Sequence, residues 1–412
     1  MNNGQKTDGL LVLLPCLRAP RLGRGTFGLT KKFVDGVSQY LEYWNGPVRV
    51  LVEPSVEVSN NLDNVTVVSS SLGFETQLVE FEADRLRPLV SQASMVHAAA
   101  SYRQNDVSTL CNDLGVPCVY SCEYSLKTRL QIVRANTKHP IVRVRRYLWE
   151  WQQERRQRLA ISRAIGVQCN GTPAFESYRN VNANPLLYFD TRATREMLLP
   201  RPALERRLET LRETRPLRLA FSGRLDAMKG VQHLPALAQQ LMRRGVDFRL
   251  TVCGAGELEG YLRNEFSRLG LARRVHMAGV KDFKSELMPF MRSDVDLFVC
   301  PHVQGDPSCT YLETMACGLP IVGFANEALS GIVSRARVGW TIPIGRVRRM
   351  AALIEQLAHD RTDIARRSRA AREVAREHTF ESTFEARVDH MRYCMDLATP
   401  ASRSVLQRKL AS

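Results

Sequence analysis

The chain has 412 residues, 44% of them hydrophobic and 24% charged, so it can bury substantial cores and is more easily divided into two domains than folded as one. Its apolar runs fall short of the roughly 18 residues that a membrane-spanning helix needs, and no signal-peptide cleavage site follows the run at 10–14. The net charge of +16 predicts attraction to polyanions, but no zinc-finger, RNP or basic-zipper pattern indicates a dedicated nucleic-acid-binding protein.

Strand-length apolar runs alternate with helix-length segments along the chain, which is typical of parallel sheets covered on both faces. In the first half these runs lie at 10–15, 48–52, 65–69, 95–100, 118–123 and 165–169. A segment rich in Arg, Glu and Pro, 192–216, precedes a second series at 217–222, 248–253, 275–278, 295–300, 321–324 and 339–342. We therefore predict an α/β fold of two Rossmann-like, doubly wound parallel-sheet domains facing a cleft, one covering 1–205 and the other 206–379.

The segment 138–158 combines six arginines with Tyr147, Trp149 and Trp151, a mixture that membrane-surface helices use. The alternative is a solvated helix whose aromatic residues pack inward. The ten cysteines are scattered without a CxxC pair. We expect neither zinc ligation nor disulfides, and we expect a reducing, cytoplasmic compartment.

Small turns and charged residues follow the strands of the second half. In chain order they are Gly223, Arg224 and Lys229; Gly254 and Gly256; Gly279, Val280 and Lys281; and the run 301–308, with a helix expected to begin at Ser308. Because ligands of open parallel sheets bind beyond the carboxyl ends of the strands, these turns should line one edge. This edge would suit a diphosphate. It offers glycines that let a ligand approach the backbone, two cations, and a helix N-terminus that favours anions. Glu313, inside that helix, could accept both hydroxyls of a ribose.

Each of these residues also has a purely structural interpretation. Glu313 completes a Thr310-x-x-Glu313 capping box, which would satisfy backbone donors only. Arg224 and Lys229 could be ordinary surface cations, and the glycines could simply serve tight turns. Their convergence on one edge favours the functional interpretation.

Three stretches of the second half also carry a family resemblance. They are FSGRLDAMKG at 221–230, VCGAGE at 252–257 and YLETMACGLP at 311–320. In order and spacing they resemble the donor domain of GT-B retaining glycosyltransferases of family 4. The first half is similar only in architecture and at 23–28, which resembles the family's glycine-rich loop between first strand and helix and would place Gly25 and Thr26 in a phosphate or acceptor loop.

The resemblance implies roles for individual residues. Arg224 and Lys229 would neutralise the donor diphosphate, Glu313 would bind the ribose, and the turn at Lys281 would face the base. Further donor contacts would come from Gly223, Gly254, Gly256, Asp306, Ser308, Cys309 and Thr310. A final helix, 380–397, would pack back on the first domain.

The chain departs from the family pattern at two places. The family spaces two glutamates eight positions apart, whereas Gly305 stands eight before Glu313, and Asp306 is the nearest carboxylate. In the first domain Glu123 replaces a histidine often found before the acceptor cleft. We predict that Glu123, at the end of a first-domain strand, orients a sugar or acceptor hydroxyl. The alternative is a buried glutamate paired with Lys127 or Arg129.

These expectations describe a retaining glycosyltransferase that moves a sugar from a nucleotide-diphosphate sugar to a saccharide or polyprenyl-linked acceptor. No metal or cofactor is expected, because Arg224 and Lys229 supply the charge, while Asp294-Val-Asp296 should lie at the opposite sheet edge. The predicted location is the cytoplasm, including a peripheral position on the inner face of the membrane. One alternative is a non-catalytic GT-B relic that binds anionic membrane or polyanion. A Rossmann oxidoreductase is disfavoured, because the first βα turn has no Gly-x-Gly-x-x-Gly that is followed by a ribose-binding acid.

Overall fold

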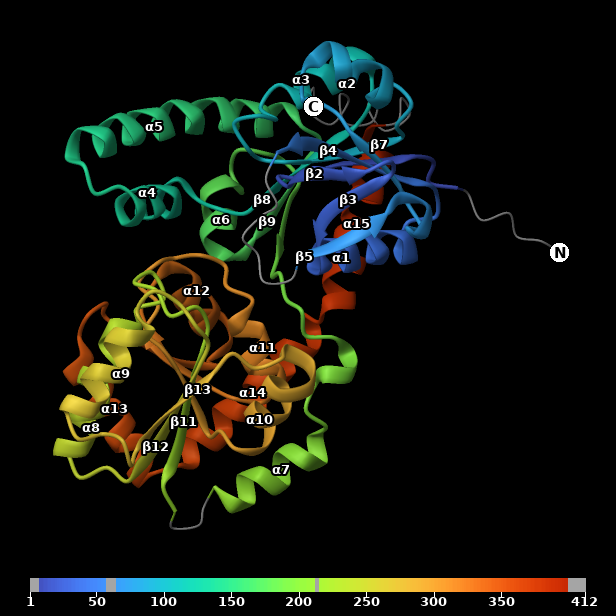
Figure 1. The fold of residues 1–412 in the computed structure, drawn as a ribbon. Coiled ribbons are helices and arrows are strands. Elements are labelled where there is room, and N and C mark those ends of the chain that lie inside the picture. The colour runs from blue at the N-terminus through green and yellow to red at the C-terminus, as the bar shows by residue number, and fades with distance from the viewer. Residues whose placement is uncertain (1–6, 57–63, 212–214, 399–412) are drawn as a thin grey trace, which may run out of the picture. The chain divides into compact units, whose positions relative to one another are not determined.

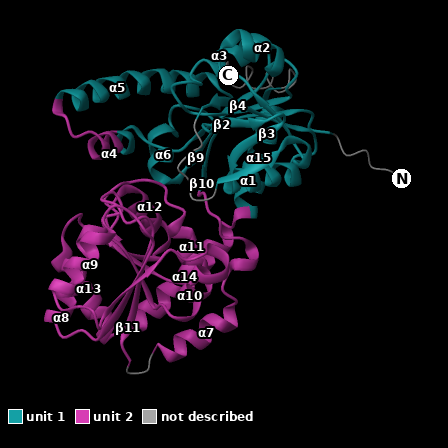
Figure 2. Cartoon of the chain, in the orientation of Figure 1, with its two compact units in different colours: residues 1–129, 141–188, 381–412 teal, residues 130–140, 189–380 magenta. Residues whose placement is uncertain are grey.

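A computed structural model describes residues 7–56, 64–211 and 215–398. The chain divides into two compact units, each with its own sheet (Figure 2). Of the described residues, unit 1 takes 7–129, 141–188 and 381–398, and unit 2 takes 130–140 and 189–380. Two α/β units of this kind confirm the predicted fold class. Among the described residues, no helix is both long enough and apolar enough to cross a membrane.

The sheet of unit 1 has the strand order β10-β9-β8-β7-β1-β4-β2-β3-β5, and β6 also pairs with β4. Its strands are β1 (Leu11–Leu14), β2 (Arg18–Gly23), β3 (Thr26–Thr30), β4 (Val48–Ser55), β5 (Asn64–Val68), β6 (Glu75–Leu78), β7 (Met95–Ala99), β8 (Cys118–Cys122), β9 (Gly166–Asn170) and β10 (Pro185–Tyr188). Neighbours are parallel except β2 with β3 and β3 with β5. The central strands are buried because helices cover them.

The helices of unit 1 follow its strands in sequence. They are α1 (Lys31–Tyr43), α2 (Ala83–Val90), α3 (Val107–Leu114), α5 (Pro140–Arg163), α6 (Gly171–Tyr178) and α15 (Phe380–Ala398), with a short 3₁₀ turn η1 (Ser69–Ser71). Helix α4 (Leu126–Asn136) begins in unit 1 and continues into unit 2. In α15 the Arg387 Nε donates to Gln168 at 2.9 Å, and the guanidinium lies 4.4 Å from the centre of the Tyr188 ring. The last described helix therefore packs within unit 1.

Unit 2 has a fully parallel sheet in the order β13-β12-β11-β14-β15-β16. The strands are β11 (Leu217–Ser222), β12 (Phe248–Cys253), β13 (Val275–Gly279), β14 (Leu297–Cys300), β15 (Ile321–Phe324) and β16 (Gly339–Ile342). The helices are α7 (Arg201–Thr210), α8 (Leu234–Arg243), α9 (Glu259–Arg268), α10 (Met288–Ser293), α11 (Thr310–Ala316), α12 (Glu327–Ala336), α13 (Val347–His359) and α14 (Thr362–Glu377), with short turns η2 (Arg195–Met197), η3 (Val231–His233) and η4 (Phe283–Leu287). The strand order reverses between β11 and β14, which makes this the switch point of the sheet.

Alternation along the strands builds two cores in unit 2, one on each face of the sheet. Leu219 and Phe221 face a cluster formed with α8, α9 and α13. Ala220, between them, belongs to the opposite cluster with α10, α11 and α12. Figure 1 shows helices on both faces of this sheet. Both faces of the sheet are therefore covered by apolar side chains, and polar functional groups can gather only at the ends of the strands.

The structure departs from the expected boundaries in two ways. The second part of unit 1, 141–188, ends at Tyr188 rather than near residue 205, because Leu199 and Leu204 pack into the core of unit 2. Residues 18–30 form the β2–β3 hairpin, where a glycine-rich loop between first strand and helix was expected. The periodicity also missed β6 and β10, which are four residues each.

Candidate functional site

The loops that follow β11 and β14 meet at the switch point of unit 2. Val303 N donates to Met228 O at 3.2 Å, and Gly230, with φ of 68°, lies directly against Pro301. A Cβ on Gly230 would stand 1.8 Å from Pro301 O, so only glycine permits this approach. The contact fixes Lys229 beside the 301–309 loop.

Lys229 and Arg224 occupy different environments. Lys229 Nζ donates to Asp306 Oδ2 at 2.9 Å, and its side chain is only 12% exposed. The Arg224 side chain is 65% exposed, with Nε 3.5 Å from Asp226 Oδ2. The interpretation as an ordinary surface cation is therefore wrong for Lys229, whereas Arg224 does lie at the surface.

A polar group without a partner lies next to Lys229. Among the described residues, Asp306 Oδ1 is buried without a hydrogen bond, and so are both ring nitrogens of His302. Burial holds the pKa of His302 well below its ordinary value, and the charge of Lys229 lowers it further, so the ring is neutral. Buried polar atoms without partners are rare, and a ligand or water commonly satisfies them. The switch point thus presents one cation and one unsatisfied carboxylate oxygen.

The glycines after β12 serve loop packing. Gly254, with φ of 130°, would place a Cβ 1.9 Å from Gly223 O, and Gly256 would place one 2.6 Å from Leu225 O. Gly223 N donates to Cys253 O at 3.1 Å. The contacts that require glycine are therefore between neighbouring loops, and this explains Gly254 and Gly256 without a ligand. Their donor-binding role stays a prediction.

Helix α11 begins at Thr310 rather than Ser308, and no side chain caps its N-terminus. The capping-box interpretation of Glu313 is therefore wrong. Its carboxylate, 9% exposed, instead accepts a hydrogen bond from Arg192 Nε at 2.8 Å. Arg192 stacks 4.1 Å from the centre of the Phe283 ring. Sequence reasoning missed Arg192, which stands 121 positions before Glu313 and carries no local signal.

The remaining candidates of unit 2 lie around this edge. Ser308 N donates to Asp306 O at 2.8 Å, and Cys309 Sγ lies 3.8 Å from Asp190 Oδ2. Lys281, after β13, lies 4.0 Å from Glu286, close enough for a weak ion pair. All the predicted donor-site residues of this unit other than Arg224 follow or flank the carboxyl ends of its strands: Gly223, Gly254, Gly256, Lys229, Lys281, Asp306, Ser308, Cys309, Thr310 and Glu313.

Asp296 lies at the opposite edge, where it joins structural ion pairs. It accepts from Arg215 at 2.8 Å and from Arg218 at 2.9 Å. Burial acts to raise the pKa of Asp296, but these hydrogen bonds outweigh it and hold the pKa below its ordinary value. The carboxylate therefore stabilises the start of β14.

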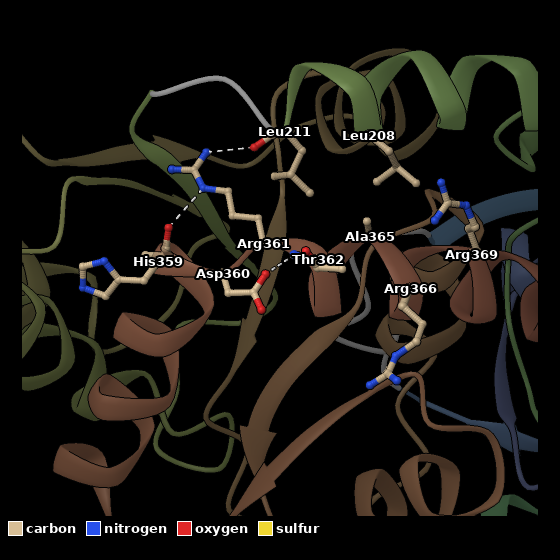
Figure 3. Close-up of a pocket in the computed structure, with 10 residues that line it drawn as sticks. Leu208, Leu211, His359, Asp360, Arg361, Thr362, Ala365, Arg366 and Arg369 are labelled. Carbon is tan, nitrogen blue, oxygen red and sulfur yellow. Dashed lines mark hydrogen bonds between the residues drawn. The ribbon is translucent and has the colours of Figure 1, made fainter.

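A hollow of unit 2 lies between α7 and α14, away from the switch point, with a volume of about 460 Å³ (Figure 3). Its cations are engaged by the protein. Arg361 Nη1 donates to Leu211 O at 3.3 Å, Arg369 binds Glu205 at 2.6 Å and Arg366 binds Asp363. These arginines stabilise the packing of the helices.

In unit 1, Glu123 follows β8 and is exposed. Asn170, at the end of β9, donates to its Oε2 at 2.8 Å, and the Tyr188 hydroxyl lies 3.5 Å from Oε1. Arg129 instead binds Glu150 and Glu154, each at 2.8 Å, so the proposed Arg129 pairing is wrong. Three neighbouring strand ends thus place a carboxylate, an amide and a phenol together.

The predicted Gly25 and Thr26 loop is the turn of the β2–β3 hairpin. Gly25 has φ of 67°, and Ser69 N donates to its carbonyl at 2.7 Å. Thr26 pairs with Gly23 and Val68 in the sheet. Turn geometry explains the glycine, and the expected loop between first strand and helix is corrected to a hairpin.

Comparisons with known proteins match this architecture. Residues 205–376 match the family model described as Glycosyl transferases group 1. The putative colanic acid biosynthesis glycosyltransferase WcaL of Escherichia coli is 29% identical over 172 residues, 40% of this chain and 42% of that protein. The amylovoran biosynthesis glycosyltransferase AmsK of Erwinia amylovora is 27% identical over 156 residues, 36% of this chain and 38% of that protein. The chain thus aligns with about two-fifths of these relatives.

Solved structures extend the likeness of fold over most of the chain. Anabaena Alr3699/HepE, solved in complex with UDP, has a TM-score of 0.65 at 13% identity over 92% of this chain and 98% of that one. Sucrose-phosphate synthase from Thermosynechococcus elongatus has a TM-score of 0.64 at 16% identity over 95% and 100%. The chain therefore has the GT-B fold of two α/β domains, and residues 205–376 within it are similar to the glycosyl transferases group 1 family.

Proposed function

We propose that the protein is a retaining glycosyltransferase that moves a hexose-type sugar from a nucleotide-diphosphate sugar to a saccharide or polyprenyl-linked acceptor. The observation that carries this proposal is the switch point of unit 2, where the mostly buried Lys229 lies beside an unsatisfied oxygen of Asp306. Support for the donor class comes from Alr3699/HepE, whose structures contain UDP or UDP-glucose. Relatives named for colanic acid and amylovoran biosynthesis support a role in cell-surface polysaccharide or glycoconjugate synthesis.

In the proposed reaction, the bond between the sugar's anomeric carbon and the diphosphate breaks, and a bond to the acceptor oxygen forms on the same face. The acceptor proton passes to the leaving phosphate, so no protein nucleophile is required. Lys229 and Arg224 stabilise the negative charge that grows on the departing diphosphate. These cations make a metal ion unnecessary, and Asp296 is engaged by two arginines at the other edge.

The other residues bind and orient the substrates in this proposal. Glu313, held by Arg192, binds the ribose, and the turn at Lys281 faces the base. Gly223, Gly254, Gly256, Asp306, Ser308, Cys309 and Thr310 complete the donor site. In unit 1, Glu123 orients a sugar or acceptor hydroxyl, and Asn170 fixes that carboxylate. The enzyme would work in the cytoplasm, where it meets its acceptor at the inner face of the membrane.

A donor panel tests this function. The protein is incubated with UDP-, GDP- and ADP-sugars in the presence of EDTA, and release of the nucleoside diphosphate is measured. We expect turnover with donors of one base, unaffected by the chelator. Turnover that EDTA abolishes would contradict metal independence. No turnover with any donor, from protein that melts cooperatively, would favour the non-catalytic GT-B relic.

A further inference from the structure

Helix α5 has two distinct faces. One face packs on unit 1 through Gln153, Glu154, Gln157, Ala160 and Ile161, all buried. These positions recur every three to four residues, with adjacent pairs at 153/154 and 160/161, as one side of an α-helix requires. The buried face covers only the C-terminal half, and the N-terminal half extends away from the sheet of unit 1 (Figure 1).

The opposite face is apolar and exposed. The α5 stripe consists of Ile141, Val144, Leu148, Trp151 and Leu159, which are 67%, 56%, 66%, 56% and 51% exposed. At 3.6 residues per turn they share one side of the helix, over about 27 Å of its length. The expectation that the aromatic residues of this segment pack inward is thus wrong for Trp151 and for Trp149, which is 41% exposed.

Charges on α5 are sorted by face. Its two acids, Glu150 and Glu154, are 13% and 9% exposed and bind Arg129. Arg145 and Arg156 are exposed beside the α5 stripe, and Arg155 is exposed within it; within the described parts of the chain these three arginines form no ion pair. The outer surface of the helix therefore combines apolar side chains with positive charge alone.

We propose that the α5 stripe docks the protein on an anionic lipid bilayer. The apolar side chains would enter the boundary between headgroups and acyl chains, and the flanking arginines would bind acidic headgroups. Tryptophan favours this boundary because its ring is amphipathic. The net charge of +16 adds long-range attraction to the same surface. Nucleic acid would match the arginines but leave the five apolar side chains in water.

The test measures binding, so it does not depend on the proposed activity. Full-length protein is sedimented with vesicles of phosphatidylcholine alone or mixed with phosphatidylglycerol, at low and high salt. Leu148→Ser/Trp151→Ser removes apolar contacts, with Tyr261→Ser on α9, 45% exposed, as its control. Arg155→Glu/Arg156→Glu reverses the charge, and Arg348→Glu/Arg349→Glu, exposed residues of α13, makes the same change in unit 2.

We expect binding to anionic vesicles that salt weakens. A near-surface cation contributes roughly fivefold, so Arg155→Glu/Arg156→Glu should weaken binding by at least about twentyfold. Leu148→Ser/Trp151→Ser should weaken it about tenfold, with melting unchanged and both controls close to wild type. Equal binding to neutral and anionic vesicles, or equal losses in the control variants, would overturn the proposal. The proposal would also be overturned if the wild-type protein were a dimer that does not bind vesicles and Leu148→Ser/Trp151→Ser made it monomeric.

Discussion

At the scale of single residues, the proposed donor edge already pairs its charges within the protein. Lys229 is held by Asp306 and Glu313 by Arg192, each at 2.8 to 2.9 Å. Such pairs fix the side chains in place before a ligand arrives, which lowers the entropy cost of binding. The sequence motifs identified Lys229 and Glu313 as candidate residues of the donor site. They could not predict Arg192, because its partner is distant in the chain and only the fold brings the two together.

Glu313→Gln tests the ribose contact directly. We expect it to weaken nucleoside diphosphate binding by about tenfold or more, since a carboxylate accepts charge-assisted hydrogen bonds that an amide cannot replace. The decisive comparison uses calorimetry with the ribonucleotide and its 2′-deoxy and 3′-deoxy forms. The preference of wild type for ribose should shrink in the variant. If all forms lose affinity equally, Glu313 only holds Arg192 in place.

Glu123→Gln addresses unit 1. The variant keeps the shape and the Asn170 neighbour but removes the charge that would orient a hydroxyl. We expect sugar transfer to fall on the order of 10²-fold, with nucleotide affinity within about twofold. Transfer kinetics and nucleotide titration on one preparation measure both. Weakened nucleotide binding in proportion to partial unfolding would instead assign Glu123 a structural role.

At the scale of elements, close loop contact makes Gly254 indispensable to unit 2. Gly254→Ala would drive a Cβ to 1.9 Å from Gly223 O, at a φ that alanine rarely adopts. We expect a loss of about 2 kcal/mol or more in the free energy of unfolding, read from denaturant melts. Gly260→Ala, in α9 with no atom within 4 Å of the new Cβ, is the control and should be neutral or stabilising. Equal stability of the two variants would contradict the packing argument.

The elements themselves were predictable where patterns are strong. All six strands of unit 2 were expected, since each is a short, mainly apolar run in a segment that alternates with helices. The β2–β3 hairpin was missed because apolar and polar residues do not alternate clearly along Arg18–Gly23. The residues of β2 that are buried are covered by neighbouring elements. In α5 the mixture of arginines and aromatic residues is visible in the sequence. That the acids face inward and the apolar residues outward could not be predicted, because it depends on tertiary contacts.

At the scale of the whole molecule, the chain passes between its units at 129–130, 140–141, 188–189 and 380–381. A single boundary near residue 205 could not describe this arrangement. A change in amino-acid composition can indicate a linker, but it does not indicate where the chain returns to a unit that it has already left. The fold class nevertheless followed from the sequence, since two series of buried strands leave few other architectures.

The most direct test of the account compares Lys229→Ala with wild type on the donor that the panel identifies. Losing an electrostatic catalyst of this kind should lower kcat/KM by about 10²- to 10³-fold, with unchanged melting. Lys31→Ala, an exposed lysine of unit 1, is the control and should match wild type. A change in kcat/KM of less than about threefold for Lys229→Ala in folded protein would contradict the central claim that this switch point stabilises a departing diphosphate.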